Sequence, residues 1–395
     1  MPMRYIFGAL ILGLALFPRY SPEPDVKTGA IQYYLSDTDP DYRYLEGLQR
    51  SRGQCKKIMS KETEIAVLRG GIARDCATTQ GDWMCAKAFK ALDWYEKTTP
   101  TTRCEPTFNE FFEQFYGAEL GFVLSERGVT ERPKIGSLKF GDLNDHALRF
   151  NDRVQYIITT NPDLNTLIPE VIRCVINLLV IEKKEDGFSI IFNPKIAEQR
   201  LRDHPEEQKY LLGLLDNFVK NEEVPIPFEF GALMNYYYSP LHKRVLAAIS
   251  DESAHFLIAH EYAHALLHHD TKDAYVQSTE GQKVEVLQRP FAQEFEADEK
   301  GFELWLEVLK EADLDDKLSG VIVSSPDVFL TICEMLQVRQ DILRVPSVSR
   351  FPDPSIRRAR IRALMLKYKL RDEGKTDFGM LFHSAARMAL SGDVQ

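Results

Sequence analysis

The chain has 395 residues, which is enough for two domains of ordinary size. Hydrophobic residues make up 44% and charged residues 27%, a balance typical of globular proteins and not of disordered or fibrous ones. The net charge is −10 with no long basic block, so the sequence predicts no nucleic-acid partner, because binding to phosphates needs a basic surface.

The first segment, residues 1–19, is predicted to be a signal peptide or a short membrane anchor. Thirteen uncharged, mostly apolar residues run from Tyr5 to Phe17. A membrane-spanning helix needs about 20 residues, so this run instead has the length of the hydrophobic part of a signal peptide. Gly13 and Ala15 are small residues that could precede a cleavage site. We expect an exported protein, periplasmic or secreted, rather than a cytoplasmic one; an ordinary core helix is the remaining alternative.

The cysteines favour the same compartment. Four of them lie in one stretch of fifty residues that follows the first segment: Cys55, Cys76, Cys85 and Cys104. Their spacing contains no C-x-x-C, so a zinc knuckle is not expected. Two disulfides would fit an exported protein, and four reduced thiols would fit a cytosolic one. Cys174 and Cys333 lie in apolar segments with a helical pattern and are predicted to be buried thiols.

Residues 20–140 are predicted to form a helical, cysteine-containing region with a tether and a linker. The tether, 20–45, is rich in proline and aspartate, and the text from Leu45 to Tyr116 has apolar residues at helical spacing. Proline and several glycines between 127 and 142 predict a domain boundary there.

The second domain is predicted to span 141–375, and 376–395 is a C-terminal tail. The expected elements of the domain are a strand at 154–160, a helix around Leu167–Glu182, a strand at Phe188–Asn193 and a helical segment from Ile196 to Lys220. A last helix is expected in the tail, at Met380–Leu390.

Two of its segments leave alternatives open. The strand FSIIFN could pair with an extended peptide substrate or lie inside the sheet. The run NYYYSP, Asn235 to Pro240, could line a cleft, but such a run is more often a half-buried strand or loop.

A candidate metal site lies in IAHEYAHALLHHD, Ile258 to Asp270. Residues four apart share one face of a helix, so His260 and His264 can both turn a ring nitrogen to one metal ion. Glu261 directly follows the first histidine, where its carboxylate can reach a water molecule at the metal. Apolar neighbours predict a largely buried helix, and buried histidines need partners.

The limits of this helix can also be predicted. Asp251 or Ser253 could cap its start. His268 and His269 are expected to close it, where an imidazole is stabilised by the helix dipole. His255 lies off the ligand face and is expected to be structural.

A catalytic zinc ion takes three protein ligands and keeps one position open. The long metzincin pattern fails because Leu267 and Asp270 stand at its glycine and histidine positions. A second helix, opened by Pro290, carries Glu294 and Asp298 four residues apart. One of them can bind the metal while the other orients a ligand histidine.

The second helix has features that favour this pairing. Ala297 and Gly301 are small enough to let two helices approach closely. Glu280 and Glu285 are rival third ligands, but neither is followed by an aspartate four residues later.

HEYAH, followed about thirty residues later by EFEAD, resembles the motifs of gluzincin metallopeptidases of the CAAX-protease and HtpX type. It is also similar to those of the phage-exclusion protease Lit and its relatives. The resemblance implies that His260, His264 and Glu294 bind zinc, that Glu261 is the catalytic base, and that Asp298 supports a ligand.

The resemblance covers roughly residues 188–366. A third family element, a His-Pro segment before an Arg-x-x-Arg helix, corresponds to FPDPSIRRARIRAL, with Arg357 and Arg360 in matching places. Phe351 replaces the family's histidine, so the group that stabilises the oxyanion is not identified. The family's multiple membrane spans are not expected, because no internal apolar run is long enough.

The sequence therefore predicts a zinc-dependent endopeptidase with one zinc ion per chain and a protein or peptide substrate. The expected fold class is α+β, predominantly helical, with a zincin-like metallopeptidase core behind the helical N-terminal region. A non-catalytic, zinc-stabilised structural protein is one alternative, which an intact Glu261 disfavours. The other is an interaction protein whose cysteine-rich region binds a partner. The oligomeric state stays open.

Overall fold

The computed structural model describes most of the chain after residue 33. The described residues are 34–55, 95–104, 107–129, 133–138, 146–149, 156–184, 187–220, 240–269, 274–279, 282–287, 291–311, 316–345, 352–372 and 376–391, with scattered positions between 62 and 93. The predicted signal peptide lies outside them.

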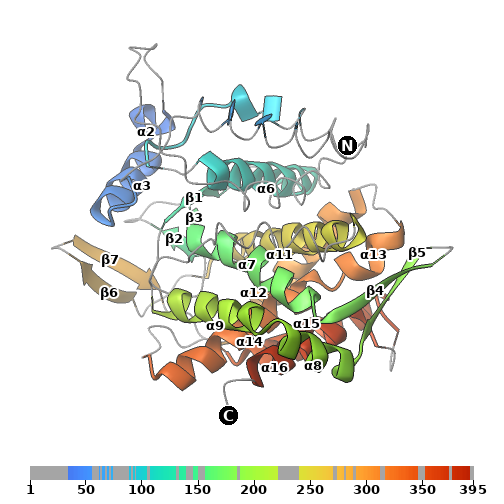
Figure 1. The fold of residues 1–395 in the computed structure, drawn as a ribbon. Coiled ribbons are helices and arrows are strands. Elements are labelled where there is room, and N and C mark those ends of the chain that lie inside the picture. The colour runs from blue at the N-terminus through green and yellow to red at the C-terminus, as the bar shows by residue number, and fades with distance from the viewer. Residues whose placement is uncertain are drawn as a thin grey trace.

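The described chain is mostly helical, with small sheets, and so belongs to the α+β class (Figure 1). Its first half contains α2 (Leu35–Thr38), α3 (Pro40–Ser51), α6 (Thr107–Glu126), β1 (Lys134–Ser137), β2 (His146–Arg149), β3 (Tyr156–Thr160), α7 (Pro162–Ile176), β4 (Leu179–Lys184) and β5 (Gly187–Phe192). Its second half contains α8 (Pro194–Asp203), α9 (Pro205–Val219), α11 (Pro240–Leu266), β6 (Ala274–Thr279), β7 (Gln282–Leu287), α12 (Phe291–Glu311), α13 (Asp316–Ile322), α14 (Ser325–Leu343), α15 (Pro354–Lys367) and α16 (Phe378–Leu390).

The strands form short sheets beside the helices. β3 lies between β1, to which it is parallel, and β2, to which it is antiparallel. β4 with β5 and β6 with β7 are antiparallel hairpins. The strands expected at 154–160 and Phe188–Asn193 are thus confirmed as β3 and β5, and the last helix is confirmed as α16.

Two expected helices differ in the structure. The helix expected around Leu167–Glu182 ends at Ile176, because Leu179, Val180 and Ile181 pair with β5 instead. An apolar, β-branched run fits a paired strand as well as a buried helix. The helical text from Ile196 to Lys220 forms two helices, α8 and α9, because Pro205 disfavours helical backbone at the residue before it.

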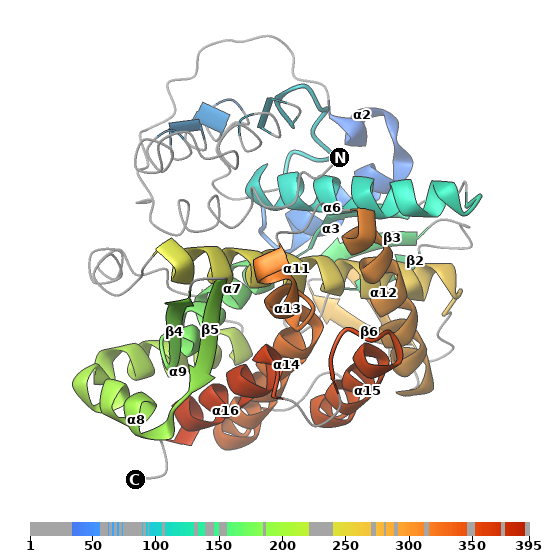
Figure 2. The same ribbon diagram turned by 90° about the vertical axis from the view of Figure 1, so that its right-hand side faces the viewer.

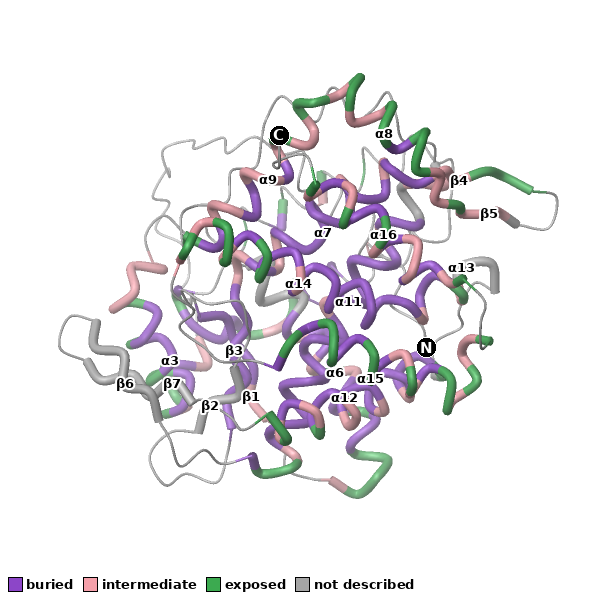
Figure 3. The backbone as a smooth tube through the Cα atoms, turned by 90° about the horizontal axis from the view of Figure 1, so that it is seen from below, coloured by how far each residue is buried: buried purple, intermediate pink, exposed green. Residues whose placement is uncertain are grey.

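α11 is the central helix of the fold. It packs against α6, α7, α12 and α14, and the two views place α6 along one side of it and α14 on the other (Figure 1, Figure 2). Seen from below, the buried residues concentrate along α7, α11 and α14, while α8 is largely exposed (Figure 3). One apolar cluster includes residues from α6 through α16, among them Phe256, Phe302, Trp305 and Phe329.

The start of α11 differs from the prediction. The helix begins at Pro240, so Asp251 and Ser253 lie inside it and do not cap it. Both are buried and bonded to other elements: the Tyr116 hydroxyl donates to Asp251 at 2.5 Å, and Ser253 donates to the carbonyl oxygen of Ser325 at 3.1 Å. Such partners satisfy polar side chains that would otherwise disfavour a helix interior.

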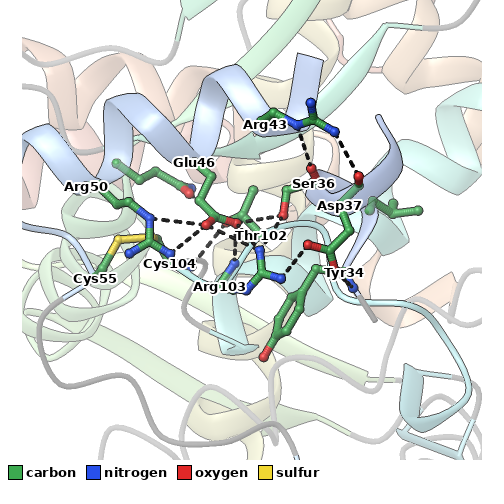
Figure 4. A network of polar contacts seen from close by, with 12 residues as sticks. Tyr34, Ser36, Asp37, Arg43, Glu46, Arg50, Cys55, Thr102, Arg103 and Cys104 are labelled. Atoms are coloured by element: carbon green, nitrogen blue, oxygen red, sulfur yellow. Dashed lines mark hydrogen bonds and ion pairs between the residues drawn. A yellow bond between two sulfur atoms is a disulfide. The ribbon is translucent and has the colours of Figure 1, made fainter. Parts of the chain in front are cut away.

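The first described segment is tied to residues 95–104 by charge and by a disulfide (Figure 4). Glu46 accepts from the Ser36 hydroxyl and from the Arg50 guanidinium, both at 2.6 Å, and pairs with Arg103 at 3.3 Å. The disulfide joins Cys55 to Cys104 beside this network.

The disulfide is of the kind that forms and persists in an oxidising, extracytoplasmic compartment. Cys76 and Cys85 lie outside the described residues, so a second disulfide stays a prediction. Both remaining cysteines are free thiols, as predicted; Cys333 is buried as expected, whereas Cys174 is only half-buried.

One described stretch, Ser319–Leu343, is long and apolar enough to cross a membrane by length and composition, so the prediction that no internal apolar run is long enough was wrong. Of its most apolar window, 78% is buried inside the protein. That degree of burial is what a core helix of a globular domain shows.

Candidate metal centre

The last turns of α11 and the first turns of α12 form a buried group of histidines and carboxylates. Gly301 of α12 faces the backbone of α11 so closely that a Cβ atom there would lie 2.7 Å from Cα of His260. Ala297, one turn earlier, is fully buried. The two small residues thus allow the close approach that the sequence predicts.

Three side chains with ligand-type atoms meet where the helices cross. Nε2 of His260 lies 3.1 Å from Nε2 of His264. The two carboxylate oxygens of Glu294 lie 3.4 Å from these two nitrogens, one from each. Ligands held at 2.0–2.1 Å in a tetrahedral metal site are about 3.3 Å apart, a separation close to the distances found here.

Glu261 lies beside this group. Its carboxylate is buried and comes within 3.9 Å of Nε2 of His260. His260, Glu261 and His264 present atoms that all lie within 4.8 Å of one another, and this group can hold one metal ion.

The charges of the centre also fit a divalent cation. Glu261, Glu294 and Asp298 are buried carboxylates, and the Arg357 guanidinium is the buried cation bonded to them through Asp298. With neutral histidines, three negative charges and one positive charge leave two negative charges among side chains that are buried. Buried charge of this kind must be paired or must coordinate a metal.

Without a metal the pKa values shift so as to supply the missing positive charge. Burial alone would lower the pKa of His260, but the adjacent carboxylates of Asp298 and Glu294 raise it to about 9. Burial would raise the pKa of Glu294, and the nearby charge of His264 holds it well below its usual value instead. The carboxylates of this group therefore stabilise positive charge on the histidines.

A carboxylate supports His260 from behind. Oδ1 of Asp298 lies 3.1 Å from Nδ1 of His260, which is the ring nitrogen that faces away from Glu294. Arg357 donates two hydrogen bonds to Asp298, at 2.9 and 2.7 Å. Burial opposes ionisation of Asp298, but the adjacent Arg357 charge lowers its pKa. Asp298 is thereby held as an anion that orients the ring of His260.

The remaining predicted residues are placed as follows. Arg360 lies over the ring of Phe295, 4.5 Å from its centre. His255 stacks on Tyr116, consistent with a structural role. Asn235–Ser239, Glu280 and Phe351 lie outside the described residues, as does the side chain of Glu285.

His269 is the residue whose position the sequence did not predict. It was expected to close the helix beside His268, but it is buried against His264. His268 is exposed and has the positive φ of 51° that ends α11. The position of His269 follows from the way the helix ends, because the residue after the left-handed residue packs back against the last turn of the helix.

Comparison with protein-family models, with curated proteins and with solved structures found no match to this chain.

Proposed function

We propose that the protein is a zinc-dependent endopeptidase with a gluzincin-type centre, in which His260, His264 and Glu294 bind the metal. The observation that carries the proposal is the spacing of 3.1, 3.4 and 3.4 Å between the two Nε2 atoms and the two carboxylate oxygens of three buried residues on two helices. Two histidines and a glutamate are a donor set typical of catalytic zinc in peptidases.

Glu261 has the position of a general base. It is buried beside both histidines, and although His260, Glu261 and His264 together could hold a metal, we assign the third ligand to Glu294, whose oxygens lie 3.4 Å from both Nε2 atoms, against 3.9 Å from Glu261 to His260. A structural zinc site has four protein ligands and needs no such carboxylate.

A bound zinc ion supplies Lewis acidity, which lowers the pKa of water to about 7 and polarises a carbonyl group. The carboxylate of Glu261 takes up the proton of the attacking water and returns it to the leaving amine. Asp298 and Arg357 keep the ring of His260 in place during these steps.

The substrate class and the location belong to the same proposal. The similarity of HEYAH and EFEAD to metallopeptidase motifs supports a protein or peptide substrate. The Cys55–Cys104 disulfide and the apolar residues 5–17 support export.

The test compares Glu261→Gln with Glu299→Gln. The first substitution keeps size and all three ligands, so zinc content and melting temperature stay at the wild-type values. Cleavage of casein, or of the natural substrate, falls by about 10²–10⁴ because the proton acceptor is lost. Glu299, a half-exposed residue of α12 paired with Lys367 at 3.5 Å, is the matched control and leaves the rate unchanged.

Equal rates for wild type and Glu261→Gln at equal zinc content would exclude this mechanism. Zinc bound at one ion per chain, with no proteolysis of any substrate tried, would favour the zinc-stabilised structural protein instead.

A further inference from the structure

The end of α11 is a helix-terminating turn that involves His264, Ala265, His268 and His269. His268 has a left-handed backbone, its N–H donates to Ala265 O at 3.3 Å, and the N–H of His269 donates to His264 O at 3.1 Å. This pair of hydrogen bonds is the Schellman motif. In that motif the residue after the left-handed one returns to pack against the residue five positions earlier.

The packed pair in a Schellman motif is usually apolar. Here it consists of two imidazoles. Nδ1 of His269 lies 2.8 Å from Nδ1 of His264, and the ring centres are 5.1 Å apart at 66°. Both rings are almost fully buried, with relative exposures of 4% and 0%. The turn that ends the helix therefore places a polar partner on the rear nitrogen of His264.

The hydrogen-bond directions follow from the arrangement. Nε2 of His264 faces His260 and Glu294, so it must be unprotonated to bind a metal. The proton of the neutral ring is then on Nδ1, and it is donated to Nδ1 of His269. The proton of His269 is consequently on its Nε2, which lies 3.2 Å from a carboxylate oxygen of Glu296.

We propose that His269 is the positioning residue of His264: it accepts from the rear nitrogen of the ligand and fixes its tautomer, and Glu296 fixes the tautomer of His269. The two ligand histidines are then supported differently. His260 faces the carboxylate of Asp298, whereas His264 faces an imidazole.

A neutral imidazole accepts a hydrogen bond without adding negative charge to a centre that already contains three carboxylates. A carboxylate in its place would raise the buried negative charge further. This inference rests on the proposed function, since it takes His264 to be a metal ligand.

The test measures Zn²⁺ affinity by competition with a chromophoric chelator, and the visible spectrum of the Co²⁺-loaded protein, for the full chain. His269→Leu puts the usual apolar residue of the motif at this position and removes the acceptor. We expect a loss of about 10- to 100-fold in Zn²⁺ affinity and a shifted Co²⁺ spectrum. In the metal-free protein the restored apolar contact and the unsatisfied Nδ1–H of His264 act in opposite directions, so the melting temperature should change little.

His269→Gln is the rescue variant, because its side-chain oxygen can accept from Nδ1 of His264; it should recover part of the lost affinity. His268→Gly is the matched control next to it. Glycine adopts the left-handed conformation freely, so Zn²⁺ affinity should be unchanged and the melting temperature equal or higher.

The outcomes separate the two proposals. Wild-type affinity and spectrum in His269→Leu would overturn the positioning role while leaving the metal centre intact. No Zn²⁺ binding by the wild type would overturn both. An equal loss in His269→Leu and His269→Gln, with metal-free melting lowered in each, would reduce His269 to a packing residue and also overturn the inference.

Discussion

Gly301 offers a direct test of how the two helices assemble the centre. A Cβ atom at this position would meet three backbone atoms of α11, at 2.7, 2.9 and 3.1 Å, and all three belong to His260 or Ala259. Carbon atoms in good contact are about 3.5–4.0 Å apart, so Gly301→Ala must separate the helices by roughly 1 Å. Backbone cannot move aside as a flexible side chain would.

Gly301→Ala should change the free energy of unfolding through two effects of opposite sign. Overpacking of this kind costs about 1–3 kcal/mol, and replacing glycine by alanine within a helix returns about 1 kcal/mol. Gly213, inside α9, is the matched control, since nothing lies within 4 Å of a Cβ atom there. Gly213→Ala should gain about 1 kcal/mol in stability. The difference between the two variants then isolates the clash, at about 1–3 kcal/mol.

The assay is denaturant unfolding of both metal-free variants, followed by Zn²⁺ competition. Glu294 and Gly301 lie on the same helix, so a displaced α12 also moves the third ligand away from the histidines. We expect Zn²⁺ affinity to fall by about tenfold or more in Gly301→Ala and to be unchanged in Gly213→Ala. If Gly301→Ala matched Gly213→Ala in both stability and affinity, the close approach of the helices would be refuted.

Two further predictions concern other contacts. Asp298→Asn removes the anion beside the buried Arg357, so it should cost about 3–5 kcal/mol of unfolding free energy even in the metal-free protein, measured by urea denaturation. An unchanged midpoint would contradict the buried ion pair. Replacing both Cys55 and Cys104 by serine removes a bond that closes a sequence separation of 49 residues. The loss of this bond should lower the free energy of unfolding by about 4 kcal/mol, because the unfolded chain regains conformational entropy. If the denaturation midpoint of the wild type were the same with and without reductant, this prediction would be wrong.

The local pattern of the sequence predicted the residues that meet at the centre. Spacing of four residues places His260 and His264 on one helix face whatever the tertiary structure. The same spacing on α12 places Glu294 toward the histidines and Asp298 behind one of them, as the distances of 3.4 and 3.1 Å to His260 show. Short-range geometry of this kind needs no knowledge of the fold.

The start of α11 could not be predicted in this way. Asp251 and Ser253 look like capping residues, because polar side chains inside a buried helix are costly unless bonded. Their partners, Tyr116 and Ser325, come from residues 135 and 72 positions away in the chain. No local pattern contains this information.

β4 shows a different limit. Leu179, Val180 and Ile181 form an apolar run that a helix or a strand can bury equally well. The outcome is decided by the hairpin with β5, in which Val180 pairs with Ile191 and Ile181 with Ile190. Tertiary pairing thus overrides the helical continuation of α7.

The buried polar residues of α11 explain how this helix is held in one position relative to the helices that pack against it. Apolar surfaces alone allow neighbouring packing arrangements of similar energy, whereas a displaced polar contact leaves a buried donor or acceptor unsatisfied, at about 1–3 kcal/mol each. Tyr116 of α6 donates to Asp251 and stacks on His255 at 4.8 Å, and Trp305 of α12 donates to Glu252 at 2.8 Å. These contacts lie within three turns of the proposed metal ligands and connect α11 to α6 on one side and to α12 on the other. A helix from the N-terminal region therefore helps to set the position of α11, and the candidate metal centre depends on contacts from both sides of the predicted domain boundary.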